Sequence, residues 1–183
     1  MIPLAQARAR AEALVELFRA NGDCPKIEIA GSIRRGKPQV KDIEIVAEPY
    51  VRTDLFGAPL DEQTKLDLFV EKEVAAGRLR KRLRADGGVQ SWGPKYKAIV
   101  TADDMPLDLF IVRAPAQWGA VFAIRTGPGD FSKFLVTACR SMGLRCDEAR
   151  LVRLADGSTF PTPTEEDFFK ACGVPWRRPE ERR

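Results

Sequence analysis

The chain has 183 residues, a formal net charge of +4 and a hydrophobic fraction of 44%, which suits a globular protein with a packed core. It contains no histidine, which excludes Ser–His and Cys–His nucleophilic catalysis, and its four cysteines form no Cys-x-x-Cys pair of the kind that structural zinc sites use. No apolar run approaches the roughly 20 residues that cross a bilayer, and residues 1–6 lack the pattern of a secretory signal. We therefore expect a protein that is not secreted and has no membrane partner.

The first 114 residues predict the helices and strands of one domain. Apolar side chains recur at helical spacing over residues 4–18 and 61–76. Alternating or mostly apolar segments predict five strands, which lie at residues 26–30, 40–46, 79–84, 96–101 and 105–112. Because the pattern changes near Ala114-Pro115, we place a domain boundary there, with residues 1–114 as the first domain.

Residues 115–183 predict a second, smaller domain that contains both helices and strands. Helical patterns cover residues 117–124 and 131–142, and a short β segment covers residues 149–154. Thr164-Glu165-Glu166-Asp167 resembles a capping box, which predicts a last short helix. The charged tail after Trp176 can fray.

A small-residue turn follows the first predicted strand. It reads Gly31-Ser32-Ile33-Arg34-Arg35-Gly36, and a short helix that begins there would point backbone N–H groups toward an anion. Ser32 and Arg35 are then placed to bind the outer phosphates of a triphosphate. By itself a Gly-Ser pair more often marks an ordinary turn, so the prediction depends on what lies nearby.

Three carboxylates lie on the predicted strands. Asp42 and Glu44 are two positions apart and therefore share one face of a strand, whereas Asp108 interrupts an otherwise apolar strand. If the strands are neighbours, the three carboxylates converge. An all-oxygen ligand set without histidine suits Mg²⁺ or Mn²⁺, and two such ions about 3.5–4 Å apart can support phosphoryl transfer. Asp108 alone could instead pair with an arginine.

Basic residues gather at two places in the sequence. Five of the seven residues 78–84 are Lys or Arg, and Lys95 and Lys97 form a second group on a predicted strand. Each group is either a solvated face or a contact surface for a polyanion such as nucleic acid.

In this order the turn, Asp42-x-Glu44 and Asp108 resemble the nucleotidyltransferase superfamily of DNA polymerase beta. Later segments of the chain are similar to the family X DNA polymerases, which belong to that superfamily. These segments are Thr126-Gly127-x-x-Asp130-Phe131, the passage from Met142-Gly143-Leu144 to Asp147-Glu148, and Trp176-Arg177-Arg178-Pro179-Glu180. The likeness covers essentially the whole chain.

The resemblance implies an α+β fold. Residues 1–114 would form a nucleotidyltransferase palm, with a mixed sheet flanked by helices, and residues 115–183 a small α/β thumb-like domain. It also implies a minimal palm-plus-thumb enzyme without a lyase domain, which is cytoplasmic or encoded by a virus or phage inside the cell. Such a DNA-directed DNA polymerase would use two Mg²⁺ ions, with Mn²⁺ as a substitute. It would act as a monomer that fills gaps in DNA repair, on a primer-template or gapped duplex and a nucleoside triphosphate.

The resemblance also implies roles for individual residues. Asp42, Glu44 and Asp108 would be catalytic and would bind the metal ions. The nucleotide would be bound by Gly31, Ser32, Arg35, Arg125, Thr126, Gly127 and Asp130. Nucleic acid would be contacted by Arg34, Lys95 and Lys97. For Arg34 the alternative is packing, for Arg125 a salt bridge between the lobes, and for the two lysines a solvated edge.

The chain departs from the family pattern at Glu44, at Ile124-Arg125 and at Ser132, which stands where the family has Asn. Glu44 stands where the family usually has Asp, and Ile124-Arg125 replaces a Tyr-Phe pair that screens the sugar of the nucleotide. The choice between deoxyribose and ribose is therefore not carried over. Two other functions stay open, namely nucleotide transfer without a template or to an RNA end or small molecule, and a non-catalytic nucleic-acid-binding module.

Overall fold

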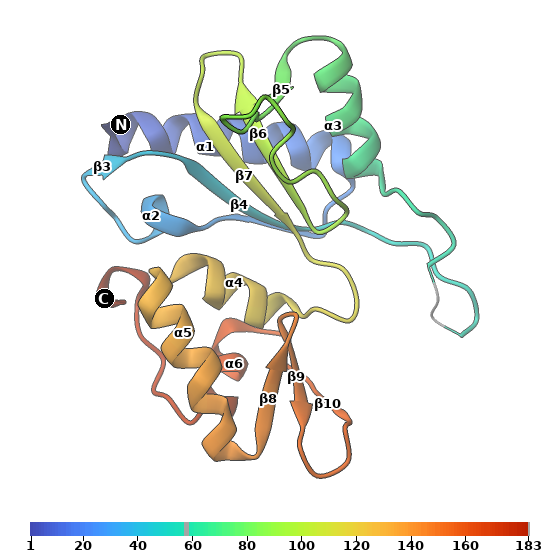
Figure 1. The fold of residues 1–183 in the computed structure, drawn as a ribbon, viewed down its shortest axis with the longest axis vertical. Helices are drawn as coiled ribbons and strands as arrows, with labels where there is room; N and C mark the ends of the chain where they lie inside the picture. Colours follow the sequence, from blue (N-terminus) through green and yellow to red (C-terminus); the bar gives the residue numbers. More distant parts are fainter. Residues whose placement is uncertain (57–58, 183) are drawn as a thin grey trace. The chain divides into compact units, whose positions relative to one another are not determined.

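The computed structural model describes residues 1–56 and 59–182, and the chain forms two compact units (Figure 1). Unit 1 comprises Met1–Ile29 and Pro38–Ile111, and unit 2 comprises Ala30–Lys37 and Val112–Arg183. The turn after the first long strand is thus grouped with the C-terminal part of the chain. Both units contain helices and strands, which confirms the α+β class.

Unit 1 is built on a five-stranded sheet with the order β2-β4-β7-β6-β5. Its strands are β2 (Lys26–Ile29), β4 (Ile43–Glu48), β5 (Leu79–Lys81), β6 (Tyr96–Thr101) and β7 (Pro106–Ile111). β4 and β7 run parallel, and the other neighbours are antiparallel, so the sheet is mixed as the resemblance implies.

Two helices, α1 (Leu4–Gly22) and α3 (Lys65–Ala75), pack on one face of this sheet (Figure 1). Phe18 of α1 meets Phe69 of α3 edge to face, with ring centroids 6.2 Å apart. The strand residues of the helix-covered face are fully or almost fully buried, and they include Ile27, Ile43, Ile45, Ile99, Leu107 and Leu109. Alternation places Glu44 and Asp108 on the opposite face.

The predicted strand over residues 40–46 is wrong in one respect, because it is two strands. Gln39–Val40 forms β3, which pairs with β1 (Ile2–Pro3) in a separate two-stranded sheet. The chain then changes partner, and β4 begins only at Ile43. Asp42 therefore lies at the entrance to β4 instead of within a strand.

Unit 2 combines helices with a three-stranded antiparallel sheet of order β10-β9-β8. Its elements are α2 (Gly31–Arg34), α4 (Trp118–Thr126), α5 (Gly129–Ala138), η1 (Cys139–Met142), β8 (Leu144–Asp147), β9 (Arg150–Arg153), β10 (Thr159–Phe160), α6 (Glu165–Ala171) and η2 (Pro179–Glu181). The predicted capping box is present, since Thr164 Oγ1 accepts from the Asp167 backbone N–H and the Asp167 carboxylate accepts from that of Thr164. Phe131, Leu135, Phe168 and Phe169 form the centre of the core.

No helix in the described part of the chain has both the length and the apolar composition that crossing a membrane requires.

Candidate functional site

The three predicted acidic residues lie at one place in unit 1, where β4 and β7 are neighbours. Glu44 of β4 and Asp108 of β7 are register partners, so their side chains leave the sheet on the same face. Asp42 precedes Glu44 by two residues at the start of β4, and all three residues are half-buried. β4 and β7 are therefore neighbouring strands, which is the condition on which the sequence prediction depended.

Asp42 and Asp108 interact electrostatically. Burial raises the pKa of the Asp42 carboxyl above its usual value, the negative charge of Asp108 raises it further, and the Arg82 guanidinium opposes both effects. Two carboxyls that repel in this way favour a cation between them. Carboxylate oxygens are the ligands that Mg²⁺ and Mn²⁺ prefer, so the donor chemistry of this pair fits such an ion.

The expected convergence of three carboxylates is not seen. Within residues 1–56 and 59–182, no three Asp, Glu, Cys or His side chains are arranged to hold one ion together. Glu44 has the correct register, but its extra methylene places its carboxylate farther from the strand than that of an aspartate. Asp42 and Asp108 therefore act on each other electrostatically, and Glu44 is the register partner of Asp108.

Asp108 has two further partners, and one of them is an arginine, as the alternative reading of the sequence allowed. Its Oδ1 atom accepts a hydrogen bond from the Tyr96 hydroxyl at 2.7 Å and forms an ion pair with Arg82 Nη2. The same Nη2 also donates to the Tyr96 hydroxyl at 3.1 Å. Asp108 is thus the acceptor at the centre of a small polar cluster, which accounts for a carboxylate in an apolar strand.

The predicted phosphate turn lies in unit 2. Gly31 and Gly36 have φ values of 58° and 69°, a conformation that glycine adopts at little cost. The Lys37 N–H donates to the Ser32 carbonyl at 3.0 Å, which closes the turn. The Ser32 hydroxyl is shielded from solvent and has no hydrogen-bond partner within the described residues, so it retains a donor for a ligand.

The two arginines of the turn bind Thr126, at the end of α4. Arg35 Nη1 donates to the Thr126 carbonyl, and Arg34 Nη1 donates to its hydroxyl at 2.7 Å. Thr126 is fully buried, and its hydroxyl accepts the hydrogen bond from Arg34 inside unit 2.

Arg34 packs inside unit 2, in line with the alternative role that the sequence left open for it. Its guanidinium binds the Glu165 carboxylate through two hydrogen bonds of 2.7 and 3.0 Å and lies 3.8 Å from the centre of the Phe122 ring. These partners use three of the five N–H donors of the guanidinium.

Glu165 also binds Arg182, near the end of the chain. Arg182 Nη1 lies 2.6 Å from Glu165 Oε1, and the Arg182 side chain is completely buried. Burial would raise the pKa of Glu165, but hydrogen bonds from Arg182 and Arg34 lower it to about 2. The tail is therefore anchored as far as Arg182, and no sequence pattern signalled this contact.

The two predicted lysine contacts differ in their surroundings. Lys95 is exposed, whereas Lys97 is only 4% exposed and its Nζ lies 3.0 Å from Asp67 of α3. The Lys97 ammonium also lies 5.1 Å from the centre of the Trp92 ring. Lys97 thus points to the helix-covered face and pairs there with an acid of unit 1, which matches neither the solvated edge nor an exposed contact surface.

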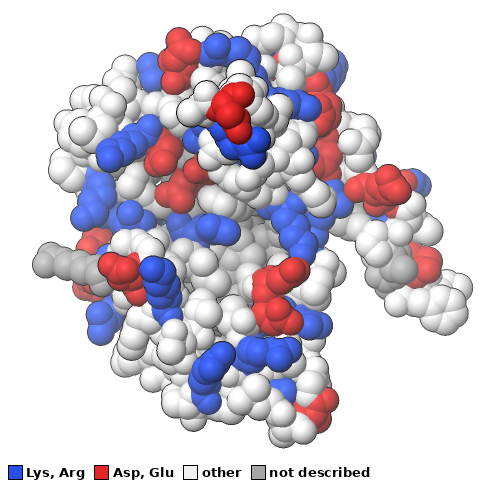
Figure 2. Space-filling view, viewed as in Figure 1, with Lys and Arg blue, Asp and Glu red and all other residues white. Residues whose placement is uncertain are grey.

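The basic run at residues 78–84 is neutralised by neighbouring acids. All five of its Lys and Arg residues form ion pairs, which are Arg78–Glu73, Arg80–Asp104, Lys81–Glu71, Arg82–Asp108 and Arg84–Asp86. Figure 2 likewise shows Lys and Arg interspersed with Asp and Glu on the face that it displays. The run is therefore a paired surface and not a concentrated positive patch.

The remaining predicted nucleotide contacts flank the start of α5. Arg125 and Asp130 are exposed, and Asp130 lies in the first turn of the helix. At Gly127 an added Cβ would come within 2.8 Å of Ser132 Oγ and 3.0 Å of Phe131 Cδ1. A side chain at position 127 would therefore push on the first turn of α5.

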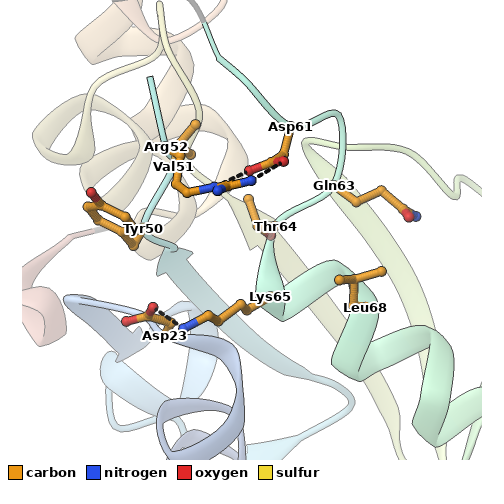
Figure 3. A pocket seen from close by; sticks show the side chains of 9 residues that line it. All are labelled: Asp23, Tyr50, Val51, Arg52, Asp61, Gln63, Thr64, Lys65 and Leu68. Atoms are coloured by element: carbon orange, nitrogen blue, oxygen red, sulfur yellow. Dashed lines mark hydrogen bonds and ion pairs between the residues drawn. The ribbon is translucent and has the colours of Figure 1, made fainter. Parts of the chain in front are cut away.

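A pocket of about 390 Å³ lies elsewhere in unit 1, beside the start of α3 (Figure 3). Two ion pairs cross it, a bidentate pair between Arg52 and Asp61 and a pair between Lys65 and Asp23. None of its nine lining residues is one that the sequence assigned to the site.

Known proteins resemble this chain in sequence and in fold. A family model described as the DNA polymerase beta thumb matches residues 122–183. The chain is 26% identical over 171 residues to DNA polymerase lambda of Rattus norvegicus, and the match covers 83% of this chain and 28% of that protein. A crystal structure of Leishmania infantum polymerase beta in a ternary P/T complex has the same fold, with a TM-score of 0.69 and 21% identity over 100% of this chain and 76% of that chain. The chain thus spans less than a third of the length of the curated relative that it matches.

Proposed function

Taking the chain as a family X DNA polymerase-like protein, we propose that it transfers a nucleotide from a nucleoside triphosphate to the 3′-hydroxyl of a DNA primer. The observation that carries the proposal is the Asp42–Asp108 pair beside Glu44, on the sheet face opposite α1 and α3 in a polymerase beta-like fold. In this assignment unit 1 contains the palm, and residues 122–183 form the thumb.

Asp42 and Asp108 would hold the divalent cations of the reaction, with Glu44 as their neighbour on β4. When bound, two Mg²⁺ ions, or Mn²⁺ in their place, would supply the positive charge that stabilises a phosphoryl transfer. The chain itself orients Asp108 through Tyr96 and Arg82, and burial of the acidic pair strengthens its attraction for a cation.

The turn at residues 31–36 is proposed to bind the leaving pyrophosphate. The buried hydroxyl of Ser32 offers a donor, and Arg35 offers a positive charge that is positioned by its bond to the Thr126 carbonyl. Arg125, Gly127 and Asp130 are proposed to line the rest of the nucleotide site. Most of the rate enhancement would come from positioning and charge stabilisation, as in other phosphoryl transfers.

The proposed acceptor is a gapped or primed DNA duplex, and the context is gap filling in repair by a monomer. The similar polymerase beta was crystallised as a ternary P/T complex, which supports this choice. Among the predicted DNA contacts, Lys95 retains an exposed position.

Primer extension by an Asp108→Asn variant tests the proposal. The substitution keeps the shape of the side chain and removes its charge, so we expect extension of a gapped duplex with Mg²⁺ to fall by at least about 10²-fold. Arg80→Gln, which alters an exposed charge paired with Asp104, should extend at the wild-type rate. Undiminished extension by Asp108→Asn would remove the mechanism.

Transfer without a template, or to another acceptor, is the second candidate. It is favoured by the ion pairing of the whole basic run at residues 78–84, which leaves little unpaired charge there for a template strand. Product lengths with and without a template strand, using each dNTP and rNTP, distinguish the two candidates.

A further inference from the structure

Two donors meet at one carboxylate oxygen of Asp108 in unit 1, one from Tyr96 on β6 and one from Arg82, which directly follows β5. Arg82 Nη2 and the Tyr96 hydroxyl both donate to Asp108 Oδ1, and Nη2 also donates to the Tyr96 oxygen. The Arg82 and Asp108 side chains are 18% and 16% exposed, so the ion pair is largely withdrawn from water. An ion pair in such surroundings is weakened less by solvent than an exposed one.

The sheet explains why these residues meet. The Arg82 N–H donates to the Ala98 carbonyl at 2.9 Å, and Ala98 is the register partner of Asp108 on β7. Because Ala98 bears only a methyl group, the Arg82 side chain can cross above β6 to reach Asp108. Tyr96 is stacked on Phe110 with ring centroids 5.0 Å apart, which fixes the direction of its hydroxyl.

The guanidinium of Arg82 contacts Asp108, and its positive charge also acts on Asp42. It opposes the rise in pKa that burial and Asp108 cause at Asp42, so its charge reaches both members of the pair. Lys41 also lowers the pKa of Asp42, but by less than Arg82 does. Glu44 adds a further acid on this face of the sheet.

One donor of Arg82 is not satisfied in this arrangement. Its Nε–H is buried and lacks a hydrogen-bond acceptor within the part of the chain that the structure describes. A guanidinium that leaves a buried donor unused is held less firmly than one with every donor paired. Moving it therefore costs less than breaking a complete network.

We propose that Arg82 is a positioning residue that serves as the built-in counter-cation of the Asp42–Asp108 pair, while Tyr96 orients Asp108 without changing the charge. The proposal rests on the proposed function, since it takes this pair as the cation site. Arg82 keeps the two acids compatible before a cation binds, and it then competes electrostatically with that cation. Arg82 therefore stabilises the cation-free state and lowers the affinity for a divalent cation.

Direct measurement of Mn²⁺ binding tests the proposal without an activity assay. The signal of free Mn²⁺ in electron paramagnetic resonance gives the dissociation constant of each variant. We expect Arg82→Gln to bind Mn²⁺ about tenfold more tightly than the wild type, because a nearby positive charge is removed. Tyr96→Phe should change the constant less than about threefold, and the matched control Arg80→Gln should leave it unchanged. Unaltered or weaker binding by Arg82→Gln would overturn the proposal.

Thermal unfolding supplies a second readout, which also shows whether Arg82→Gln folds. Without divalent cations this variant should melt below the wild type, and saturating Mn²⁺ should raise its melting temperature more than that of the wild type. Equal shifts in the two proteins would contradict the role of counter-cation.

Two further variants separate the proposal from the function on which it rests. If neither Asp42→Asn nor Asp108→Asn weakens Mn²⁺ binding, the cation site itself is wrong. If both weaken it and Arg82→Gln does not strengthen it, the cation site stands and the role of Arg82 is wrong.

Discussion

Glu165 shows how one carboxylate can organise distant parts of a unit. It accepts hydrogen bonds from Arg34, in the phosphate turn, and from Arg182, near the end of the chain. Its side chain is 5% exposed and that of Arg182 is completely buried. A buried charge is tolerated only when it is paired, so each of these groups depends on the others.

Replacing this carboxylate should destabilise the protein. Glu165→Gln leaves two guanidinium groups without their counter-charge, one of them fully buried, and we expect the free energy of unfolding in urea to fall by about 3 kcal/mol. The control is Glu166→Gln, which removes the same charge from the exposed neighbouring position of α6 and should change stability by less than about 0.5 kcal/mol.

Glu165 also makes the stability of the wild type depend on pH. The folded-state pKa of Glu165 is lowered to about 2, so its contribution is complete above the pKa of the unfolded chain, about 4.3. The contribution is lost as the pH falls from about 5 toward 2. In a series of urea unfolding curves over this range, Glu165→Gln should lose less stability than the wild type. Parallel losses in the two proteins would contradict the pairing.

At the scale of elements, Gly119 allows α4 to approach the segment before α6. An added Cβ would lie 1.9 Å from the Thr164 carbonyl oxygen and 2.7 Å from that of Thr162, which is impossible without movement. The Gly119 N–H itself donates to the Thr162 carbonyl at 3.1 Å. The close approach therefore depends on the absence of a side chain at this position.

Gly119→Ala should separate these elements and lower stability by about 1–3 kcal/mol, as overpacking does elsewhere. Gly129→Ala is a matched control in the first turn of α5, because nothing lies within 4 Å of its Cβ position. That control should be neutral or stabilising by up to about 1 kcal/mol. Calorimetric melting of both variants provides the measurement, and equal melting temperatures would refute the packing argument.

At the scale of the whole molecule, a net charge of +4 overstates the charge available for DNA. The densest basic run is paired with acids, and Lys97 is buried, so few phosphates should be contacted. Affinity for a duplex should therefore depend only moderately on salt.

Measurements of DNA affinity at several salt concentrations test whether few phosphates are contacted. Each phosphate contact contributes about −0.9 to the slope of log affinity against log salt concentration. We expect Lys95→Gln to make the slope less steep by about 0.9, and Lys97→Gln to leave it unchanged. Fluorescence anisotropy with a gapped duplex gives the slopes, and circular dichroism confirms that each variant is folded. A shallower slope for Lys97→Gln would show that its burial does not persist on DNA.

Local features of the fold could be predicted well from the sequence. The strand predicted at residues 96–101 coincides with β6, and the capping box at Thr164 opens α6 as expected. Such features depend on neighbours within a few positions of the chain. The break between β3 and β4 could not be predicted, because it arises from the pairing of Val40 with Ile2.

The sequence did not predict which acidic residue pairs with each lysine or arginine of the site. Lys97 and Arg34 looked available for DNA, yet each has an acidic partner that lies far away in the sequence, Asp67 for the first and Glu165 for the second. Arg82 belonged to a basic run, and nothing in that run indicated Asp108. Long-range ion pairs leave no periodic signal in a single sequence.

The sequence by itself determined the residue types and spacings of the phosphate turn and of the acids, the α+β class and the likeness to family X polymerases, because these rest on local pattern and composition. Only the tertiary structure decided which carboxylates meet, which arginines are already paired and which lysine is buried. The physical reason is that charges interact through space, and the distances between them are set by sheet register and helix packing rather than by position along the chain.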